Sequence, residues 1–292
     1  MTVGIAVISR EGAIIGAADR AITWGNLLVE PRRSKIMHFN NCPISILWAG
    51  SLSTASEVVT TLGALAGQRR PEEITVEGVA HTAAACIARV FGTVAETRFL
   101  VPLEHTRASL LRDDCPVSEP ERQRLLDQVQ NFEPGDAESL QLLFAGYDPD
   151  GFPHLYCVHN LQVSDHTMDG YAAIGSGAWL AKETMHRHGY ARQQTGHWRA
   201  LLLAYLAKVE AEDDLYVGPK SNLFGREHIT QKYVKIPSRL IRSLHRSYRK
   251  LKRDELTAFK KIADDIPGDF KQLMPLLAEA VAKRRRGTKR EP

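Results

Sequence analysis

Cysteine is scarce, and its spacing does not suggest a metal or redox site. The chain has 292 residues and only four cysteines. No Cys-x-x-Cys pair occurs, although close pairs of this kind mark most metal-binding and redox motifs. We therefore expect reduced thiols, no metal site and no cofactor. The cysteines are Cys42, Cys86, Cys115 and Cys157.

Long apolar runs and a secretory leader are also missing. No run approaches the roughly 20 apolar residues that a membrane-spanning helix needs. The chain opens with a strand-like segment, residues 2–8, instead of a basic region followed by an apolar helix. A Gly-x-x-x-x-Gly-Lys phosphate loop does not occur either. Together with the reduced cysteines, these absences predict a cytoplasmic protein without a membrane partner.

Acidic residues become sparse toward the C-terminus. The chain carries a formal net charge of +4, but the segment from Lys232 onward contains 18 Lys and Arg residues and only 7 Asp and Glu residues. The remainder therefore has an acidic excess, and we expect a domain over 1–236 and a basic helical extension over 237–292. The extension should pack on the body or on a neighbouring subunit. Contact with nucleic acid or another polyanion is the alternative, although no interleaved aromatic residues suggest base stacking.

Hydrophobic periodicity predicts blocks of strands and helices. Hairpins are expected over 5–18 and 35–48, each around a polar turn. Helices are expected over 53–68, 71–96, 120–129, 178–188, 198–211, 240–251 and 266–283, and further strands over 140–147, 154–158, 221–224 and 233–236. Residues 98–138 are charged and mixed in pattern, which indicates an insertion. The block order predicts sheets packed together with helices on their outer faces.

The second residue is a threonine, whose hydroxyl is a candidate nucleophile at the start of the chain. Because threonine is small, we expect a methionine aminopeptidase to remove Met1 and to leave Thr2 with a free α-amine. A hydroxyl needs a base to become a nucleophile. An α-amine, with a pKa of about 7.7–8.0, suits that task near neutral pH. Thr2 alone would then supply both nucleophile and base.

The first hairpin predicts an acid beside this threonine. If the hairpin closes tightly at Arg10 and Glu11, Thr2 lies opposite Asp19, with a shift of one residue for a bulge at Gly12. The alternative is that Asp19 marks an ordinary surface turn. Three further candidates also have alternatives without a function. These are a solvent-exposed lysine for Lys35, a turn residue for Ser176 and an acid at a helix end for Asp214.

Several segments, in order, resemble proteasome β-subunits and their bacterial relatives. The segments are Thr2-Val3-Gly4-Ile5, Gly16 to Thr23, Ser34-Lys35-Ile36, Trp48 to Ser51, Gly146-Tyr147-Asp148, His154-Leu155-Tyr156 and Ala173 to Gly177. The separation of 16 residues between Asp19 and Lys35 is similar to that of the family's active-site acid and lysine. The likeness covers about 2–97 and 139–236. It implies a four-layer αββα sandwich, the fold of N-terminal-nucleophile hydrolases.

The resemblance also implies a role for each matching residue. Thr2 would attack the carbonyl, while the positive charge of Lys35 favours the deprotonated forms that proton transfer needs. Asp19 would hold and orient Lys35. The backbone N–H of Gly50 would donate to the oxyanion.

The remaining site residues would hold the amine and the substrate. Ser176 and Asp214 are implied to bind the Thr2 amine and a nearby water. Thr23 would pair its backbone with an extended substrate. Trp48 falls at the floor of the specificity pocket, which it would make shallow or aromatic, and Ser51 adjoins it as a further substrate-binding residue.

The chain departs from the family at a few points. It begins with a single threonine before Val3-Gly4 instead of a Thr-Thr pair, and Val217 stands where the family has a second supporting serine. The resemblance implies a threonine peptidase in a ring or other homo-oligomer, acting on peptides or unfolded protein, and it leaves an ATPase unfoldase open as a partner. The alternatives are an amidase of the same fold acting on a small-molecule amide, and a catalytically silent assembly subunit.

Overall fold

The computed structural model describes residues 2–24, 27–29, 34–39, 42–112, 114–135, 139–159, 161–215 and 217–265. At 22–24, 27–29, 256 and 258–265 it describes the backbone alone. Contacts divide the chain into two units, Met1–Ile241 and Arg242–Pro292. The division falls a few residues after the domain boundary expected from the sequence.

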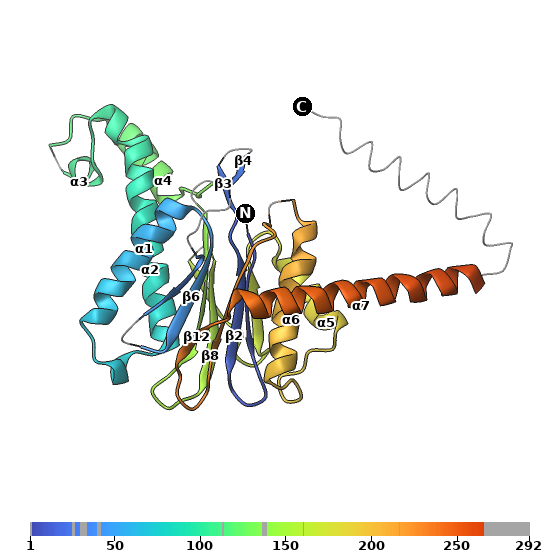
Figure 1. Cartoon of the computed structure of the whole chain (residues 1–292). Helices are drawn as coiled ribbons and strands as arrows, with labels where there is room; N and C mark the ends of the chain where they lie inside the picture. The colour runs from blue at the N-terminus through green and yellow to red at the C-terminus, as the bar shows by residue number, and fades with distance from the viewer. Residues whose placement is uncertain are drawn as a thin grey trace. The chain divides into compact units, whose positions relative to one another are not determined.

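Two five-stranded antiparallel sheets form the centre of the first unit (Figure 1). The first sheet has the order β10-β1-β2-β11-β12, with the bounds Tyr171–Ile174, Gly4–Ile8, Ile14–Asp19, Ser221–Arg226 and Tyr233–Lys235. The second has the order β5-β6-β7-β8-β9, with the bounds Ile36–His38, Ile44–Gly50, Leu140–Tyr147, Pro153–His159 and Gln162–Asp165. A separate ribbon of β3 (Ile22–Trp24) and β4 (Leu27–Val29) follows β2. Because β2 pairs with β11, early and late parts of the chain meet in one sheet.

Alternation of side chains gives the second sheet two buried faces. On β6, Leu47 and Ala49 join the apolar cluster that also contains Ala6 and Ile8 of the first sheet. Trp48, between them in sequence, points to the opposite face and into a cluster with the helices. Burial on both faces explains why these strands read as nearly continuous apolar runs.

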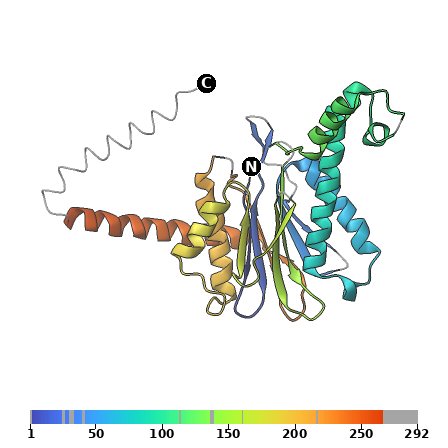
Figure 2. The same ribbon diagram turned by 180° about the vertical axis from the view of Figure 1, so that it is seen from behind.

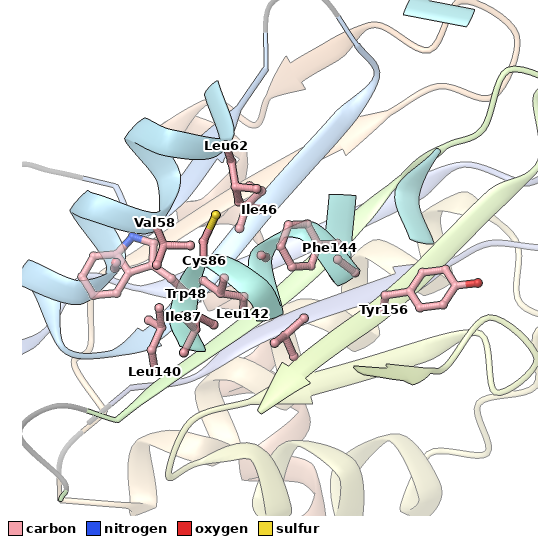
Figure 3. Packing of buried hydrophobic residues seen from close by; sticks show 14 of the residues in the cluster. Ile46, Trp48, Val58, Leu62, Cys86, Ile87, Leu140, Leu142, Phe144 and Tyr156 are labelled. Carbon is pink, nitrogen blue, oxygen red and sulfur yellow. The ribbon is translucent and has the colours of Figure 1, made fainter. Parts of the chain in front are cut away.

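Helices cover the outer face of each sheet (Figures 1 and 2). Helices α1 (Leu52–Gly67) and α2 (Val76–Phe99) lie against the second sheet, and α5 (Ala178–Arg187) and α6 (His197–Glu210) lie against the first. Figure 3 shows the cluster under α1 and α2, where Trp48 lies close to residues of both helices and of β7. The layers in the first unit therefore run helices, sheet, sheet, helices.

The insertion extends the core along α2. It contains the 3₁₀ turn η2 (Val101–Leu103) and the helices α3 (Arg107–Leu110) and α4 (Glu119–Gln130). Five buried residues form a small core with the end of α2: Ala95, Leu100, Leu110, Leu125 and Val129. Both ribbon views place α3 and α4 toward the same end of the unit as the N-terminus.

The expected helix start at Pro71 was wrong. Residues Pro71–Glu73 form a separate 3₁₀ turn, η1, and α2 begins only at Val76. Thr75 caps α2, since its hydroxyl accepts a hydrogen bond from the Gly78 N–H at 3.1 Å. Ile74 between the two helices is extended and buried, so burial of its side chain in the core interrupts the helix.

Short elements were missed, and one long helix was underestimated. The sequence interpretation assigned no strand to β3, β4, β9 or β10 and no helix to α3, all of which have only three or four residues. In contrast, α7 runs from Ser238 to Asp265, well beyond the expected end at 251. The helix expected over 266–283 lies outside the described residues.

The first hairpin closes one residue later than a tight turn would require. Ile8 pairs with Ile14, and Gly12 in the loop takes a φ of +81°, which favours glycine. Asp19 consequently lies opposite Val3, whose carbonyl accepts the Asp19 N–H at 3.2 Å. This is the shift of one residue that the bulge at Gly12 allows, and it keeps Asp19 next to the start of the chain.

One helical stretch among the described residues, Val76–Leu103, is long and apolar enough to cross a membrane by length and composition. Half of its most apolar window, 50%, is buried inside the protein. The buried side chains of this stretch pack on the second sheet and on the insertion. Packing in the core accounts for its apolar composition.

Candidate active site around Thr2

Three polar side chains from distant parts of the sequence meet at the start of β1. The Thr2 hydroxyl contacts both the Lys35 ammonium and the Asp19 carboxylate. Lys35 Nζ lies 3.1 Å from Asp19 Oδ1 and 3.4 Å from Oδ2. All three residues are buried. The structure therefore brings together the expected nucleophile, lysine and acid.

Backbone donors from separate segments hold the Asp19 carboxylate. The Val3 N–H donates to Oδ1 at 3.1 Å. The N–H groups of Ala21 and Gly218 donate to Oδ2 at 2.9 and 3.1 Å. Hydrogen bonds from so many directions satisfy the carboxylate and fix its orientation toward Lys35.

Burial lowers the pKa of Lys35 from 10.5 to about 8. The negative charge of Asp19 and its hydrogen bond act in the opposite direction, while the positive charge of Lys208 adds to the lowering. A group with a pKa near neutral pH can both accept and release a proton at little cost in free energy. The environment of Lys35 thus suits acid–base chemistry at the Thr2 hydroxyl.

Gly50 ends β6 in a conformation that favours glycine. Its φ is +107°, and a Cβ at this position would lie 2.2 Å from the carbonyl oxygen of Ser139. The Trp48 N–H donates to the Lys35 carbonyl at 3.2 Å, while the Ser51 N–H donates to Ser139 on the other side. Because N–H groups alternate in direction along a strand, the Gly50 N–H points to the Lys35 side.

The segment Gly175–Gly177 forms a cradle for the backbone of Thr2. A Cβ on Gly175 would lie only 2.1 Å from the Thr2 carbonyl oxygen, and the Gly177 N–H donates to that oxygen at 3.3 Å. Between them, the Ser176 hydroxyl is buried and has no hydrogen-bond partner in the described part of the chain. Ser176 therefore brings unused hydrogen-bonding capacity next to Thr2.

Asp214 begins the turn that carries Gly218 to Asp19. Its N–H donates to the Ala211 carbonyl, and its carbonyl accepts the Val217 N–H, both at 3.1 Å. The residue is half-buried. Its role in holding the amine or a water stays a prediction.

The three expected substrate-binding residues lie on different elements around the cluster. The Trp48 ring centroid is 5.8 Å from Lys35 Nζ, and its indole is buried in the core beneath α1 (Figure 3). The Ser51 hydroxyl caps α1, accepting the Thr54 N–H at 3.4 Å. Thr23 lies in the β3–β4 ribbon, paired with Leu28. Their part in binding a substrate stays a prediction.

The sequence interpretation missed several residues that organise this site. The Gln141 side chain accepts the Gly175 N–H at 2.7 Å and so ties the cradle to β7. Gly218 reaches Asp19 through its backbone, for which the sequence offers no signal. Lys208, a lysine within the apolar run 201–209, was the one visible signal, because a charged residue there must be paired or exposed.

No model of a known protein family matches this chain, and no curated protein matches it. Solved structures do share its mixed α/β architecture with two antiparallel sheets. The Anbu (Gly-1) mutant from Hyphomicrobium sp. strain MC1 matches with a TM-score of 0.59 and 15% identity, over 89% of this chain and 100% of that chain. Anbu from Yersinia bercovieri, described as an ancestral beta-subunit, matches with a TM-score of 0.60 and 13% identity, over 91% of this chain and 98% of that chain. At these identities the likeness shows a shared fold.

Proposed function

We propose that this protein is an N-terminal-nucleophile hydrolase of the proteasome β-subunit type, with the four-layer αββα sandwich of that class. Once Met1 is removed, Thr2 hydrolyses amide bonds in peptides or unfolded protein. The observation that carries the proposal is the contact of the buried Thr2 hydroxyl with both Lys35 and Asp19. The likeness to Anbu, described as an ancestral beta-subunit, supports it. The proposal includes a cytoplasmic location and a homo-oligomeric assembly.

In the first half of the reaction, Thr2 Oγ1 attacks the substrate carbonyl carbon. Its proton passes to the neutral α-amine of the same residue, and the charged Lys35 stabilises the developing alkoxide. The tetrahedral oxyanion accepts a hydrogen bond from the Gly50 N–H. Collapse of this intermediate breaks the C–N bond, and the leaving amine takes the proton from the α-ammonium.

In the second half, a water molecule hydrolyses the ester formed on Thr2. The water gives a proton to the α-amine and attacks the ester carbonyl. Thr2 Oγ1 then leaves and regains that proton. Ser176, whose buried hydroxyl lies next to the Thr2 backbone, and Asp214 orient the amine and the water.

Covalent labelling tests this proposal directly. The purified full chain is incubated with a threonine-directed electrophile, and its N-terminal peptide is mapped by mass spectrometry. We expect a peptide that begins at Thr2 and carries one adduct. Thr2→Ala, whose small side chain permits the same removal of Met1, should stay unlabelled, and Thr2→Ser should be labelled. A wild-type chain that keeps Met1 and forms no adduct would contradict the proposal.

The catalytically silent alternative is favoured by one observation. Val217 occupies the position of the family's second serine, is buried, and lies near Gly177, where a Cβ would be 2.9 Å from the valine methyl. This position therefore offers no hydroxyl to the Thr2 amine. Val217→Ser separates the two functions: a subunit silenced by the missing hydroxyl is unlabelled as the wild type and becomes labelled as Val217→Ser, whereas an enzyme is labelled in both forms.

A further inference from the structure

The helix α6 contains a buried lysine that the proposed reaction does not use. Lys208 is 0% exposed. Its ammonium donates to Glu212 Oε1 at 2.6 Å and to the carbonyl oxygen of Gly218 at 2.7 Å. The neighbouring residues of α6, including Ala207 and Val209, are buried and apolar. Lys208 is thus a charged group enclosed between α6 and the turn that precedes β11.

Gly218 connects this lysine to the candidate site. Its carbonyl accepts from Lys208, and its N–H donates to Asp19 Oδ2 at 3.1 Å. The same glycine therefore bonds Lys208 on one side and Asp19 on the other. Asp19 in turn contacts Lys35 and Thr2.

Stability alone does not account for Lys208. Enclosing the charge of Lys208 carries a large desolvation cost, and a well-packed apolar side chain often stabilises a fold as well or better. The Coulomb interaction of Lys208 with Lys35 is also unfavourable, because both are cations. The hydrogen bond from Lys208 to the Gly218 carbonyl is an interaction that an apolar side chain could not make, and it gives a reason for a lysine at this position.

We propose that Lys208 is a positioning residue for the Thr2, Lys35 and Asp19 cluster, acting through the backbone of Gly218. It pins the turn so that the Gly218 N–H stays on the Asp19 carboxylate, which then keeps its orientation toward Lys35. The catalytic consequence rests on the function proposed above. The effect on Gly218 and on Lys35 does not require catalysis and can be measured without it.

The positive charge of Lys208 also reaches Lys35. The titratable groups facing Lys35 in the described residues are Asp19 on β2 and Lys208 on α6, with Glu212 paired to the latter. The charge of Asp19 raises the pKa of Lys35, and that of Lys208 lowers it. Losing the charge of Lys208 therefore acts to raise the pKa of Lys35, whereas a displacement of Asp19 acts to lower it.

The test compares Lys208→Met with the wild type in the full chain. NMR of ¹³Cε-labelled lysine follows the titration of Lys35, and ¹⁵N NMR follows hydrogen exchange at the Gly218 amide. We expect faster exchange at Gly218 and a pKa of Lys35 that differs from the wild-type value, because the lost charge of Lys208 raises it and a displaced Asp19 lowers it. Lys208→Arg, which keeps a cation able to donate to the same carbonyl, should restore both toward the wild-type values.

The matched control is Lys182→Met on α5. It removes the same charge from an exposed position and should change neither readout. If Lys208→Met does not fold, Glu212→Ala replaces it, because Glu212 is partly exposed and its loss removes one hydrogen-bond partner of the Lys208 ammonium. A smaller increase in Gly218 exchange is then expected.

Activity provides the last readout. Turnover of an amide substrate by Lys208→Met should fall about 10- to 100-fold in kcat, with little change in KM, because the reacting groups are misplaced while substrate contacts remain. A folded Lys208→Met variant with wild-type Gly218 exchange and wild-type Lys35 titration would overturn the inference. If the wild type shows no turnover, the proposed function fails, and the two NMR readouts still decide the role of Lys208.

Discussion

The carbonyl oxygen of Thr2 lies where the side chain of residue 175 would have to be. A Cβ on Gly175 would approach that oxygen to 2.1 Å, and the φ of Gly175 is +89°. Backbone atoms cannot move aside as a flexible side chain can, so glycine is required here on two grounds. The position of the proposed nucleophile depends on this contact.

We therefore predict that Gly175→Ala destabilises the protein and displaces Thr2. The free energy of unfolding should fall by more than about 2 kcal/mol, since strained backbone and a backbone clash act together. Denaturant unfolding of the folded variant measures this change. Any labelling of Thr2 by an electrophile should also slow markedly.

Gly92→Ala is the matched control. Gly92 lies inside α2, and a Cβ there meets nothing within 4 Å. Alanine should stabilise this helix position by up to about 1 kcal/mol. Equal effects of the two substitutions would refute the proposed requirement at Gly175.

The rate of amide hydrolysis should depend on pH in a bell-shaped manner. Above pH 8 the rate should fall, because Lys35, whose pKa is lowered to about 8, loses the charge that stabilises the developing alkoxide. Below the pKa of the Thr2 amine the rate should also fall, because the amine is protonated and cannot act as a base. The measurement is kcat/KM from mildly acidic to alkaline pH.

A different profile would assign a different role to Lys35. If the rate rises through pH 8 and stays level at higher pH, neutral Lys35 is the base, and the α-amine is not. The profile of Lys182→Met should coincide with that of the wild type, because this exposed lysine lies on α5 and takes no part in the cluster.

Asp19→Asn should destabilise the fold and disturb Lys35. The asparagine amide cannot replace both oxygens, which together accept from Val3, Ala21, Gly218 and Lys35. Leaving a buried lysine without its partner costs about 3–5 kcal/mol, which denaturant unfolding measures. The pKa of Lys35 should fall further, because the charge and hydrogen bond of Asp19 raise it.

Asp150→Asn serves as the comparison. Asp150 Oδ1 accepts only an exposed turn hydrogen bond from the Phe152 N–H, at 3.0 Å among the described contacts. An asparagine oxygen can accept the same bond, so stability should change by no more than about 0.5 kcal/mol. A similar loss at both positions would mean that Asp19 contributes no more than an ordinary surface acid.

Ending the chain after Ile241 should leave the first unit folded. The described core clusters lie within Met1–Ile241, and the removed segment begins where the second unit begins. The melting temperature should change by no more than about 2 °C, as measured by circular dichroism. Light scattering on the same samples reports whether the basic extension takes part in assembly. Failure of the truncated chain to fold would show that the units are not independent.

The paired sheets and most of their helices could be predicted because their signals are long and local. The strand 140–147 and the helix 198–211 were recognisable from a continuous apolar run and from helical spacing, and both appear close to the expected bounds. The exposed edge strand β9 and the ribbon β3–β4 carry no such pattern. Their strand structure depends on pairing partners, which a single segment of sequence does not reveal.

The candidate site divides in the same way. Thr2, Asp19 and Lys35 could be named in advance because the hairpin register and the family spacing identify particular side chains in the sequence. The supporting groups are backbone atoms: the N–H groups of Gly218 and Ala21 and the cradle at Gly175. Every residue except proline has a backbone N–H, so only the folded path of the chain singles these out.

The pairing of β2 with β11 sets the order in which the site can form during synthesis. Thr2 and Lys35 leave the ribosome early, but the Asp19 carboxylate lacks one of its donors until Gly218 has emerged and β11 has closed onto β2. On a chain still attached to the ribosome, Thr2 thus lies beside an acid whose orientation is not yet fixed. If Thr2 acts as proposed above, this order shields neighbouring chains, and the chain itself, from cleavage until β11 has closed onto β2.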